Sequence, residues 1–280
     1  MDVRDAQHAV PRVSVLMPFH RIDAYLTRAV ESMLSQRFTD FELLLIADAR
    51  LGDVVREVRA NCGDDARLKV LPSLAVGGLA AGLNLGISHA LGHYIARMDS
   101  DDVSLPGRLA EQVAYMDRHG DVAVLGARLT LMDEFDREIQ QTYPFYETDR
   151  AIRAVLPLRN PMPHPALMFR KEVLVAMGGY KYAHSAEDWE LLIRLARNNQ
   201  WKLHNLDQVL VHYRRHSGQV TRPELTQIVF YETAGFLFTE FLRTWRFKYL
   251  AAIAIKLPVL ARARLLLRRV RGEHVPVLQT

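Results

Sequence analysis

Residues 94–102 read Tyr-Ile-Ala-Arg-Met-Asp-Ser-Asp-Asp, and this stretch decides how the rest of the sequence is interpreted. Its first five residues are mostly apolar, as in a strand buried within a parallel sheet. Three carboxylates, Asp99, Asp101 and Asp102, follow at once. Carboxylates this close repel one another unless a cation neutralises them, and such oxygen ligands favour Mg²⁺ or Mn²⁺. A solvated acidic turn that caps the next helix is the alternative interpretation.

The segments before residue 94 alternate between strand-like and helix-like patterns. Asp23, for example, precedes a segment whose apolar residues recur at the helical period. Such alternation predicts a mostly parallel sheet flanked by helices, with ligands at the carboxyl ends of the strands. The predicted strands are 13–17, 41–47, 67–71 and 94–98, and helices are predicted after Asp23, at 53–61 and at 79–91.

The pattern after residue 102 is more mixed. Ser104 is predicted to cap a helix that starts near residue 105, with Pro106 in its first turn. Strands at 122–127 and 166–170, a helix at 186–198 and two helical stretches at 223–247 and 249–270 complete the prediction.

The composition indicates a globular protein of a reducing compartment. The chain has 280 residues, of which 49% are hydrophobic and 24% charged, enough apolar material for a sizeable core. Cys62 is the one cysteine, so an internal disulfide is excluded. Residues 1–12 do not read as a signal peptide, and no segment has the roughly 18–20 uncharged apolar residues that a spanning helix needs. A cytoplasmic protein is expected.

The basic charge gathers at the end of the chain. Residues 241–280 contain nine basic residues and one acid, which indicates a negatively charged partner surface. The body of the chain gives no reason to expect nucleic-acid binding. Residues 249–261 form an apolar run, too short to span a bilayer, close to Trp245 and Phe247. Two interpretations stay open: an interfacial helix on an anionic membrane leaflet, or a helix packed on the domain or on a second copy in a homodimer.

Other polar residues are ambiguous when taken singly. Glu187 and Asp188 begin an apolar helical segment, where the helix dipole keeps a carboxylate ionised and suits it as a proton acceptor; helix capping is the alternative. Arg214 is suited to neutralise phosphates, or lies in a solvated turn, and His164 and His216 are equally open to structural roles. The glycines between residues 77 and 86 form no phosphate loop, which disfavours P-loop enzymes and ordinary dinucleotide dehydrogenases.

Taken in order, these segments resemble the inverting family-2 glycosyltransferases of the GT-A fold, of the bacterial cell-envelope and polysaccharide type. The resemblance covers roughly residues 12–220. It is carried by residues 13–18 (VSVLMP), 78–87 (GLAAGLNLGI), 94–102 (YIARMDSDD), 106–109 (PGRL), 164–170 (HPALMFR), 178–180 (GGY), 187–191 (EDWEL) and 213–216 (YRRH).

The resemblance implies a role for each cluster. Asp99 and Asp101 match the DXD signature that holds Mn²⁺ or Mg²⁺ on the nucleotide-sugar diphosphate, and His216 matches a position that can approach this metal. Asp188 matches the general base that deprotonates the acceptor hydroxyl. The other donor-side residues that the resemblance implies are Pro18, Phe19 and His20 around the nucleoside, Asp48 on the base, Gly78, Asn84 and Ser100, and the acceptor-side residues are His164, Glu187 and Arg214.

The function implied by the resemblance is metal-dependent, inverting transfer of a sugar from a nucleotide sugar to a hydroxyl of a glycan or lipid-linked acceptor. A GT-A domain would span residues 1–222, with a nucleotide-binding half at 12–98 and a metal and acceptor half at 99–222, followed by a basic helical tail at 223–280. A UDP-sugar is the default donor. Peripheral association with the inner face of the cytoplasmic membrane fits a lipid-linked acceptor.

The sequence also departs from the family pattern. Residues 47–50 read Ala-Asp-Ala-Arg where many relatives have Asp-Asp-Gly-Ser, His20-Arg21 replaces Tyr-Asn, and Leu83 replaces an arginine. These changes leave the base and sugar of the donor open. Two other functions are alternatives. A nucleotidyltransferase acting on sugar phosphates gives no reason for the segments around Asp188 and His216. A non-catalytic sugar-nucleotide-binding module has no need of Asp188.

Overall fold

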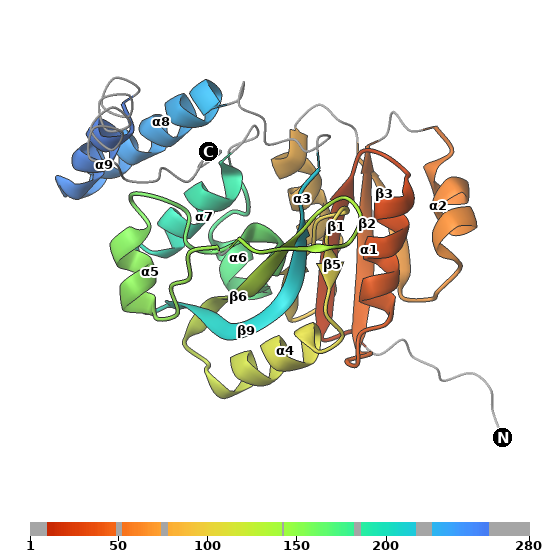
Figure 1. The fold of residues 1–280 in the computed structure, drawn as a ribbon. Coiled ribbons are helices and arrows are strands. Elements are labelled where there is room, and N and C mark those ends of the chain that lie inside the picture. Colours follow the sequence, from red (N-terminus) through yellow and green to blue (C-terminus); the bar gives the residue numbers. More distant parts are fainter. Residues whose placement is uncertain are drawn as a thin grey trace.

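The computed structural model describes residues 10–48, 52–73, 78–141, 143–181, 186–216 and 226–257. Within these ranges a sheet of nine strands is flanked by helices on both faces (Figure 1). Along the sheet the strands follow the order β3-β2-β1-β4-β8-β6-β9-β5, and β7 pairs with β6. This is the expected α/β architecture.

The first half of the chain forms the expected parallel part of the sheet. Asp23 caps the first helix, because its side chain accepts hydrogen bonds from the backbone N–H groups of Tyr25 and Leu26 at 3.0 and 3.1 Å. β2 and β4 both pair with β1 in parallel, and β3 pairs with β2 in the same sense. The elements are β1 (Val13–Phe19), α1 (Ala24–Leu34), β2 (Phe41–Asp48), α2 (Val54–Cys62), β3 (Leu68–Ser73), α3 (Gly78–His89) and β4 (Tyr94–Arg97).

The second half continues the same sheet with strands of both directions. The pairings of β6 and β9 make these two long strands run in the direction of β1, whereas the short strands β5, β7 and β8 run against it, so the sheet is mostly parallel. The elements are β5 (Val103–Ser104), α4 (Arg108–Arg118), β6 (Val122–Met132), β7 (Glu138–Ile139), α5 (Asp149–Val155), η2 (His164–Ala166), β8 (Met168–Arg170), α6 (Lys171–Ala176), α7 (Glu187–Leu195) and β9 (Lys202–Arg214).

The prediction of a helix capped by Ser104 was wrong. Ser104 lies in β5 and pairs with Val211, and its backbone N–H donates to Ser32 Oγ at 3.0 Å. α4 begins at Arg108, after Gly107, so Pro106 also precedes the helix. A partner on the distant β9 therefore outweighs the local capping signal. β9 itself was not predicted, because its sequence mixes charged and apolar residues.

Two apolar layers hold the sheet between its helices. The alternation of side chains along β1 sends Val15 and Met17 to one face and Leu16 to the other. The first face packs against α1, α2 and α4, and the second against α3, α6 and α7. The carboxyl ends of the strands are thereby left at one edge, between the two layers of helices.

The tail forms two helices that pack on the domain. α8 (Thr226–Thr244) and α9 (Lys248–Lys256) contribute buried side chains to the core layer that contains Trp189 of α7. The ring of Phe236 lies 5.7 Å from that of Trp189, and Lys256 Nζ lies 3.5 Å from the centre of the Trp189 ring. Part of the apolar run at 249–261 thus packs on the domain, whereas residues 258–270 of the predicted second helix lie outside the described residues. No helix of the described residues is long and apolar enough to cross a membrane.

Candidate active site

The three acidic residues after β4 form a close cluster. One carboxylate oxygen from each of Asp99, Asp101 and Asp102 lies within 4.8 Å of the other two. Asp102 is fully buried and accepts a hydrogen bond from the Arg214 backbone N–H at 2.8 Å, while its Oδ2 has no hydrogen-bond partner among the described residues. Burial, followed by the charges of Asp99 and Asp101, raises the pKa of Asp102 well above its usual value. A divalent cation fits these residues, because it would relieve both the repulsion and the unpaired oxygen.

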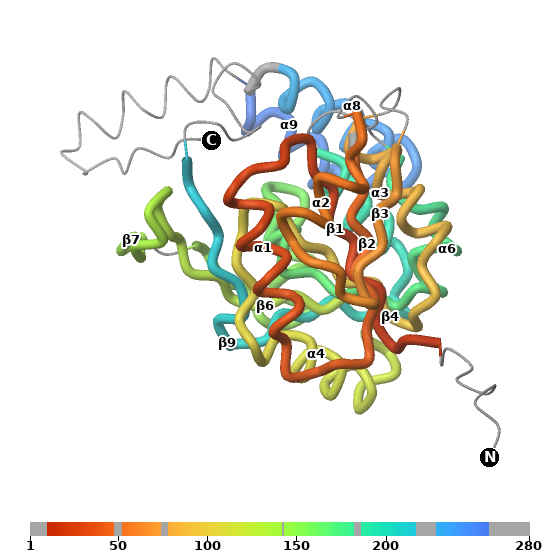
Figure 2. The backbone as a smooth tube through the Cα atoms, turned by 90° about the vertical axis from the view of Figure 1, so that its right-hand side faces the viewer, coloured from red at the N-terminus to blue at the C-terminus, as the bar shows by residue number. Residues whose placement is uncertain are grey.

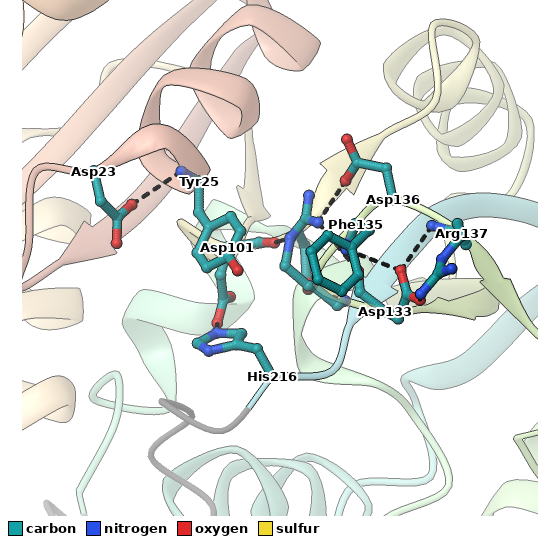
Figure 3. A network of polar contacts seen from close by, with 10 residues as sticks. Asp23, Tyr25, Asp101, Asp133, Phe135, Asp136, Arg137 and His216 are labelled. Atoms are coloured by element: carbon teal, nitrogen blue, oxygen red, sulfur yellow. Dashed lines mark hydrogen bonds and ion pairs between the residues drawn. The ribbon is translucent and has the colours of Figure 1, made fainter.

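The end of β9 brings Arg214 and His216 to this cluster. Arg214 is buried; its Nε donates to the Asp101 carbonyl oxygen at 2.8 Å, and its guanidinium lies over the Tyr25 ring at 4.6 Å. His216 Nε2 lies 3.0 Å from Asp101 Oδ2. Figure 3 shows Tyr25, Asp101 and His216 next to one another, with Asp136 farther to the right in the view. The first helix and the last strand therefore meet at the acidic cluster.

Arg97, the last residue of β4, connects the acidic cluster to the second group of acids. Its side chain is 3% exposed and ion-paired with Asp99, and its Nε has no hydrogen-bond partner among the described residues. Burial raises the pKa of Asp99, an effect that Asp101 increases and the Arg97 charge opposes. The same guanidinium also acts electrostatically on Glu187 and Asp188, so a single buried cation serves both groups.

Glu187 and Asp188 form the first turn of α7. Asp188 Oδ2 accepts a hydrogen bond from Asn160 Nδ2 at 2.7 Å, and Oδ1 accepts one from the Trp189 backbone N–H at 2.6 Å. Burial raises the pKa of Asp188 to about 6, and burial together with the Asp188 charge raises that of Glu187 to about 7. The N-cap position is Ala186, so neither carboxylate occupies it. Asp188 is therefore a carboxylate poised to exchange a proton near neutral pH.

His164 lies in the buried layer behind these acids. Its Nε2 is 2.9 Å from the Tyr180 hydroxyl and its Nδ1 is 3.8 Å from Glu187 Oε1. Burial, and then the charge of Arg97, lowers the pKa of His164 well below its usual value, so the imidazole is neutral at pH 7. The contact of His164 is with Tyr180 and Glu187, not with an open surface.

The predicted donor-side residues gather where β1 and β2 end. Pro18 and Phe19 pair with Ile46 and Ala47 as the last residues of β1, so they belong to a strand and not to a loop as predicted. Phe19 is 4% exposed and packs in the core, which leaves the exposed His20 as the loop residue. The other predicted donor-side residues are Asp48 at the end of β2, whose side chain lies outside the described residues, Gly78 at the start of α3, and the half-buried Ser100.

The side chain of Asn84, which was predicted on the donor side, makes its hydrogen bonds to the protein backbone. Its Oδ1 accepts a hydrogen bond from the Tyr180 backbone N–H at 2.9 Å, and its Nδ2 donates to the Tyr180 carbonyl oxygen at 2.8 Å. A Cβ on Gly179 would lie 2.3 Å from the same Oδ1. The amide of Asn84 thus ties α3 to the segment before α7, and this contact explains its place in the motif.

A cavity of about 410 Å³ is lined by residues of β6 and β7 and of the segments 143–145 and 161–163; Asp188 itself does not line it. Pro161 and Pro163 line one side of it, next to Asn160, the partner of Asp188. Tyr143 lines it as well, and burial together with the Asp188 charge raises the pKa of this phenol. The remaining lining comes from β6, β7 and their surroundings, and includes Arg128, Thr130, Glu138, Gln140, Gln141 and Phe145. Polar and aromatic groups of this kind suit a polyhydroxylated ligand.

Three residues of the site were missed by the sequence analysis. The sequence did point to Arg97, because a charged residue inside an apolar strand that is predicted to be buried needs a partner of opposite charge or a hydrogen-bond partner. Asn160 and Tyr25 carried none, because each lies far in sequence from the acid that it accompanies. Their recognition depended on the tertiary structure.

Comparison with known proteins identifies the family. The pattern of glycosyl transferase family 2 matches residues 14–177, more than half of the chain. The chain belongs to glycosyltransferase family 2. It is therefore a glycosyltransferase, and the nucleotidyltransferase and non-catalytic alternatives fall away.

Individual relatives agree with this assignment. The O-antigen biosynthesis glycosyltransferase WbnJ of Escherichia coli is 34% identical over 237 residues, which cover 82% of this chain and 89% of WbnJ. The UDP-Gal:alpha-D-GlcNAc-diphosphoundecaprenol beta-1,3-galactosyltransferase of Escherichia coli is 27% identical, over 73% of this chain and 74% of its own.

A solved structure supports the fold. The mannosyltransferase PcManGT from Pyrobaculum calidifontis, in complex with GDP-Man and Mn²⁺, superposes with a TM-score of 0.66 at 16% identity, over 95% of this chain and 76% of its own. At this identity the likeness concerns the fold alone, which is GT-A.

Proposed function

We propose that this glycosyltransferase transfers a sugar from a UDP-sugar, with inversion and with Mn²⁺ or Mg²⁺, to a hydroxyl of a glycan or lipid-linked acceptor. The proposal rests on two sets of acidic residues that share the buried cation Arg97 and are suited to different chemical roles. One is the acidic cluster of Asp99, Asp101 and Asp102, and the other is the buried Asp188, whose pKa is raised to about 6. A single displacement needs both a charge-neutralising site and a base.

Asp188 acts as the base in this proposal. Its carboxylate accepts the proton of the acceptor hydroxyl while the acceptor oxygen bonds to the anomeric carbon and the bond from that carbon to the diphosphate oxygen breaks. Attack opposite the departing diphosphate inverts the anomeric configuration. The hydrogen bond from Asn160 holds the carboxylate in position, and the backbone N–H of Trp189 holds its other oxygen.

Asp99, Asp101 and His216 would hold the metal. When bound, the divalent cation neutralises negative charge on the departing diphosphate. In the protein alone, Arg97 orients Asp99, and the Asp101 carboxylate lies against His216. Arg214 holds the backbone of this turn through the Asp101 carbonyl oxygen, so its role is to position the cluster.

The UDP-sugar is proposed because the donor of the related galactosyltransferase is UDP-Gal. The nucleoside would lie at the ends of β1 and β2, near His20, Asp48 and Gly78. The departures at Asp48-Ala49-Arg50 begin in the sequence at the last residue of β2, so they bear on the choice of base and sugar.

The acceptor is proposed to bind in the cavity whose lining includes Pro161, the residue after Asn160, which is the hydrogen-bond partner of Asp188. The rings of Tyr143 and Phe145, with Pro161 and Pro163, offer flat apolar surfaces, while Gln140 and Gln141 offer hydrogen bonds. This mixture suits the faces and hydroxyls of a saccharide. The related galactosyltransferase acts on a diphosphoundecaprenol-linked sugar, which supports a lipid-linked glycan and a location at the inner face of the membrane.

Two variants separate metal and donor binding from chemistry. Asp188→Asn should lose on the order of 10²–10⁴-fold in turnover with little change in UDP affinity, because the base acts in the transition state. Asp101→Asn should weaken UDP binding in the presence of Mn²⁺. Sugar transfer and isothermal calorimetry with UDP, in Mn²⁺ or EDTA, measure both effects.

Asp64→Asn, which changes an exposed carboxylate 81% accessible at its side chain, is the matched control and should behave as the unmodified enzyme. Equal UDP affinity in Mn²⁺, in EDTA and in Asp101→Asn would refute the metal site. Normal turnover of a folded Asp188→Asn would remove Asp188 from the mechanism.

A further inference from the structure

α8 has two apolar faces, and the described residues of the chain cover one of them. Phe236, Leu237 and Phe241 are buried in the core layer. On the opposite side lie Ile228, Tyr231, Phe238, Leu242 and, directly after the helix, Trp245, all between 44% and 70% exposed. Their spacing of three and four residues, with Gly235 between Tyr231 and Phe238, places them in one stripe along the helix. We call this stripe the outer face of α8.

The outer face ends at Trp245, which combines an unusual backbone conformation with an exposed side chain. Trp245 has a φ of 53°, a left-handed conformation that bulky residues rarely adopt, yet its indole is 69% exposed. Phe247 is 71% exposed, and both rings lie 5.5 Å from the Phe241 ring that anchors them to the core. A costly backbone conformation that directs an indole into solvent points to a function for that indole.

The charges around this end are positive. Arg243, Arg246 and Lys248 are exposed, and none of the three forms an ion pair with another residue of the described chain segments. Glu240, the acid of the same stretch, is buried and paired with Arg197. Aromatic rings with adjacent cations fit the interface of an anionic bilayer, where the rings lie at headgroup depth and the cations meet phosphates.

A second copy of the chain fits the outer face less well. The exposed charges beside the stripe near Trp245 are of one sign, so they offer no complementary pairs to a copy. The charge therefore favours a lipid surface.

We propose that the outer face of α8, together with Trp245 and Phe247, lies on an anionic membrane surface. α8 and α9 lie along the same side of the molecule as the carboxyl end of β9 in both views (Figures 1 and 2), and His216 follows two residues after the last residue of β9, Arg214. A membrane-bound acceptor would thus be presented at the active-site end. The inference deepens the proposed location of the enzyme, and it names a different segment from the apolar run at 249–261, whose Tyr249 and Ala252 are buried.

Flotation of the full-length protein with vesicles tests the proposal without donor or metal, so its outcome is independent of sugar transfer. Vesicles of phosphatidylcholine with phosphatidylglycerol should bind the protein at low salt, and binding should weaken as salt screens the charges. Vesicles of phosphatidylcholine alone should bind it at least about tenfold less. In a Trp201→Phe protein, which keeps Trp245 and the buried Trp189, the emission of Trp245 should shift to the blue and be quenched by brominated phosphatidylglycerol.

Variants locate the surface. Phe238→Ser with Trp245→Ser should weaken binding about tenfold or more, because both remove apolar contact with the bilayer. Arg243→Gln with Arg246→Gln should weaken it by a similar factor at low salt and have little effect at high salt. The controls change exposed residues elsewhere: Leu158→Ser with Val175→Ser, and Arg28→Gln with Arg56→Gln. They should bind as the unmodified protein does.

Several results would overturn the proposal. One is the absence of binding to phosphatidylglycerol vesicles at low salt, and another is an equal loss of binding in the control variants. Sedimentation showing a dimer that Phe238→Ser dissociates would assign the outer face to a second copy. If the serine variants fail to fold, the quenching of Trp245 in the Trp201→Phe protein still decides: unquenched emission in bound protein refutes the placement.

Discussion

At the scale of single residues, the proposed base Asp188 and its hydrogen-bond partner Asn160 predict a pH dependence of turnover. Burial raises the pKa of Asp188 to about 6, and a base must be deprotonated to act. Turnover should therefore rise with pH and be half-maximal near pH 6. Asn160→Ala removes a hydrogen bond to the ionised carboxylate, which raises its pKa and should move the rising limb to higher pH.

The pH profile of kcat for both proteins measures this shift. Asn198→Ala, which changes an asparagine remote from Asp188, is the control and should leave the profile in place. An Asn160→Ala enzyme with an unshifted limb would show that the ionisation belongs to another group.

At the scale of elements, the turn between α6 and α7 depends on two glycines for different reasons. Gly178 and Gly179 have φ values of 73° and 61°, so alanine at either position carries a backbone cost of about 1–2 kcal/mol. Gly179→Ala also places a Cβ 2.3 Å from Asn84 Oδ1, whereas the nearest atom to a Cβ at Gly178 is 3.9 Å away. Gly179→Ala should therefore destabilise the fold more than Gly178→Ala.

Urea unfolding measures both free energies, and the difference between them isolates the clash. Adding Asn84→Ala to each variant is the internal check, because it should reduce the difference. Equal free energies of unfolding for the two glycine variants would contradict the role of Asn84 as a tie between α3 and this turn.

The two faces of α8 predict opposite outcomes for the same substitution. Leu237 is fully buried and Leu242 is 52% exposed on the same helix. Leu237→Ala should lower the free energy of unfolding by about 2–5 kcal/mol, the usual cost of a core leucine, and Leu242→Ala by less than about 0.5 kcal/mol. Thermal and urea unfolding test this. Equal effects would mean that α8 does not pack through the face described.

At the scale of the whole molecule, the buried acids link stability to pH and to metal. The folded-state pKa values of Asp188 and Glu187, about 6 and about 7, lie above the ordinary values of these groups. The folded state thus holds their protons more tightly than the unfolded state, so their contribution is present below about pH 4 and is lost as pH rises towards about 7. Shifts of about two pKa units in each acid correspond to a fall of up to about 6 kcal/mol in the free energy of unfolding in EDTA over this window.

Urea unfolding at a series of pH values in EDTA checks the fall, and Glu187→Gln should flatten it. Mn²⁺ should oppose the fall, because it binds the ionised acidic cluster of the folded state. A free energy of unfolding that rises between about pH 5 and about pH 7 in EDTA would have the wrong sign for these acids.

The amino-acid sequence by itself determined the alternating elements of the first half and the family. Helical period, apolar runs and a capping aspartate are local signals, so β1 to β4 and their helices follow from neighbouring residues. The motif segments identified the glycosyltransferase in the same way. Local signals failed where a distant partner won, as at Ser104, which pairs with β9 instead of capping α4.

Only the tertiary structure decided which residues share a site. Tyr25, Asp101 and His216 come from the first helix, the middle of the chain and the end of the last strand, and they meet because β9 ends beside the acidic turn. The same holds for the hydrogen bond between Asn160 and Asp188, and for the hydrogen bonds of the Asn84 amide to the Tyr180 backbone. The tail, too, had two open interpretations until the fold covered one face of α8 and left the other exposed. The physical reason is common to all these cases. The burial of a side chain and its hydrogen-bond partner depend on which distant segment packs against it, and a local sequence pattern does not contain that information.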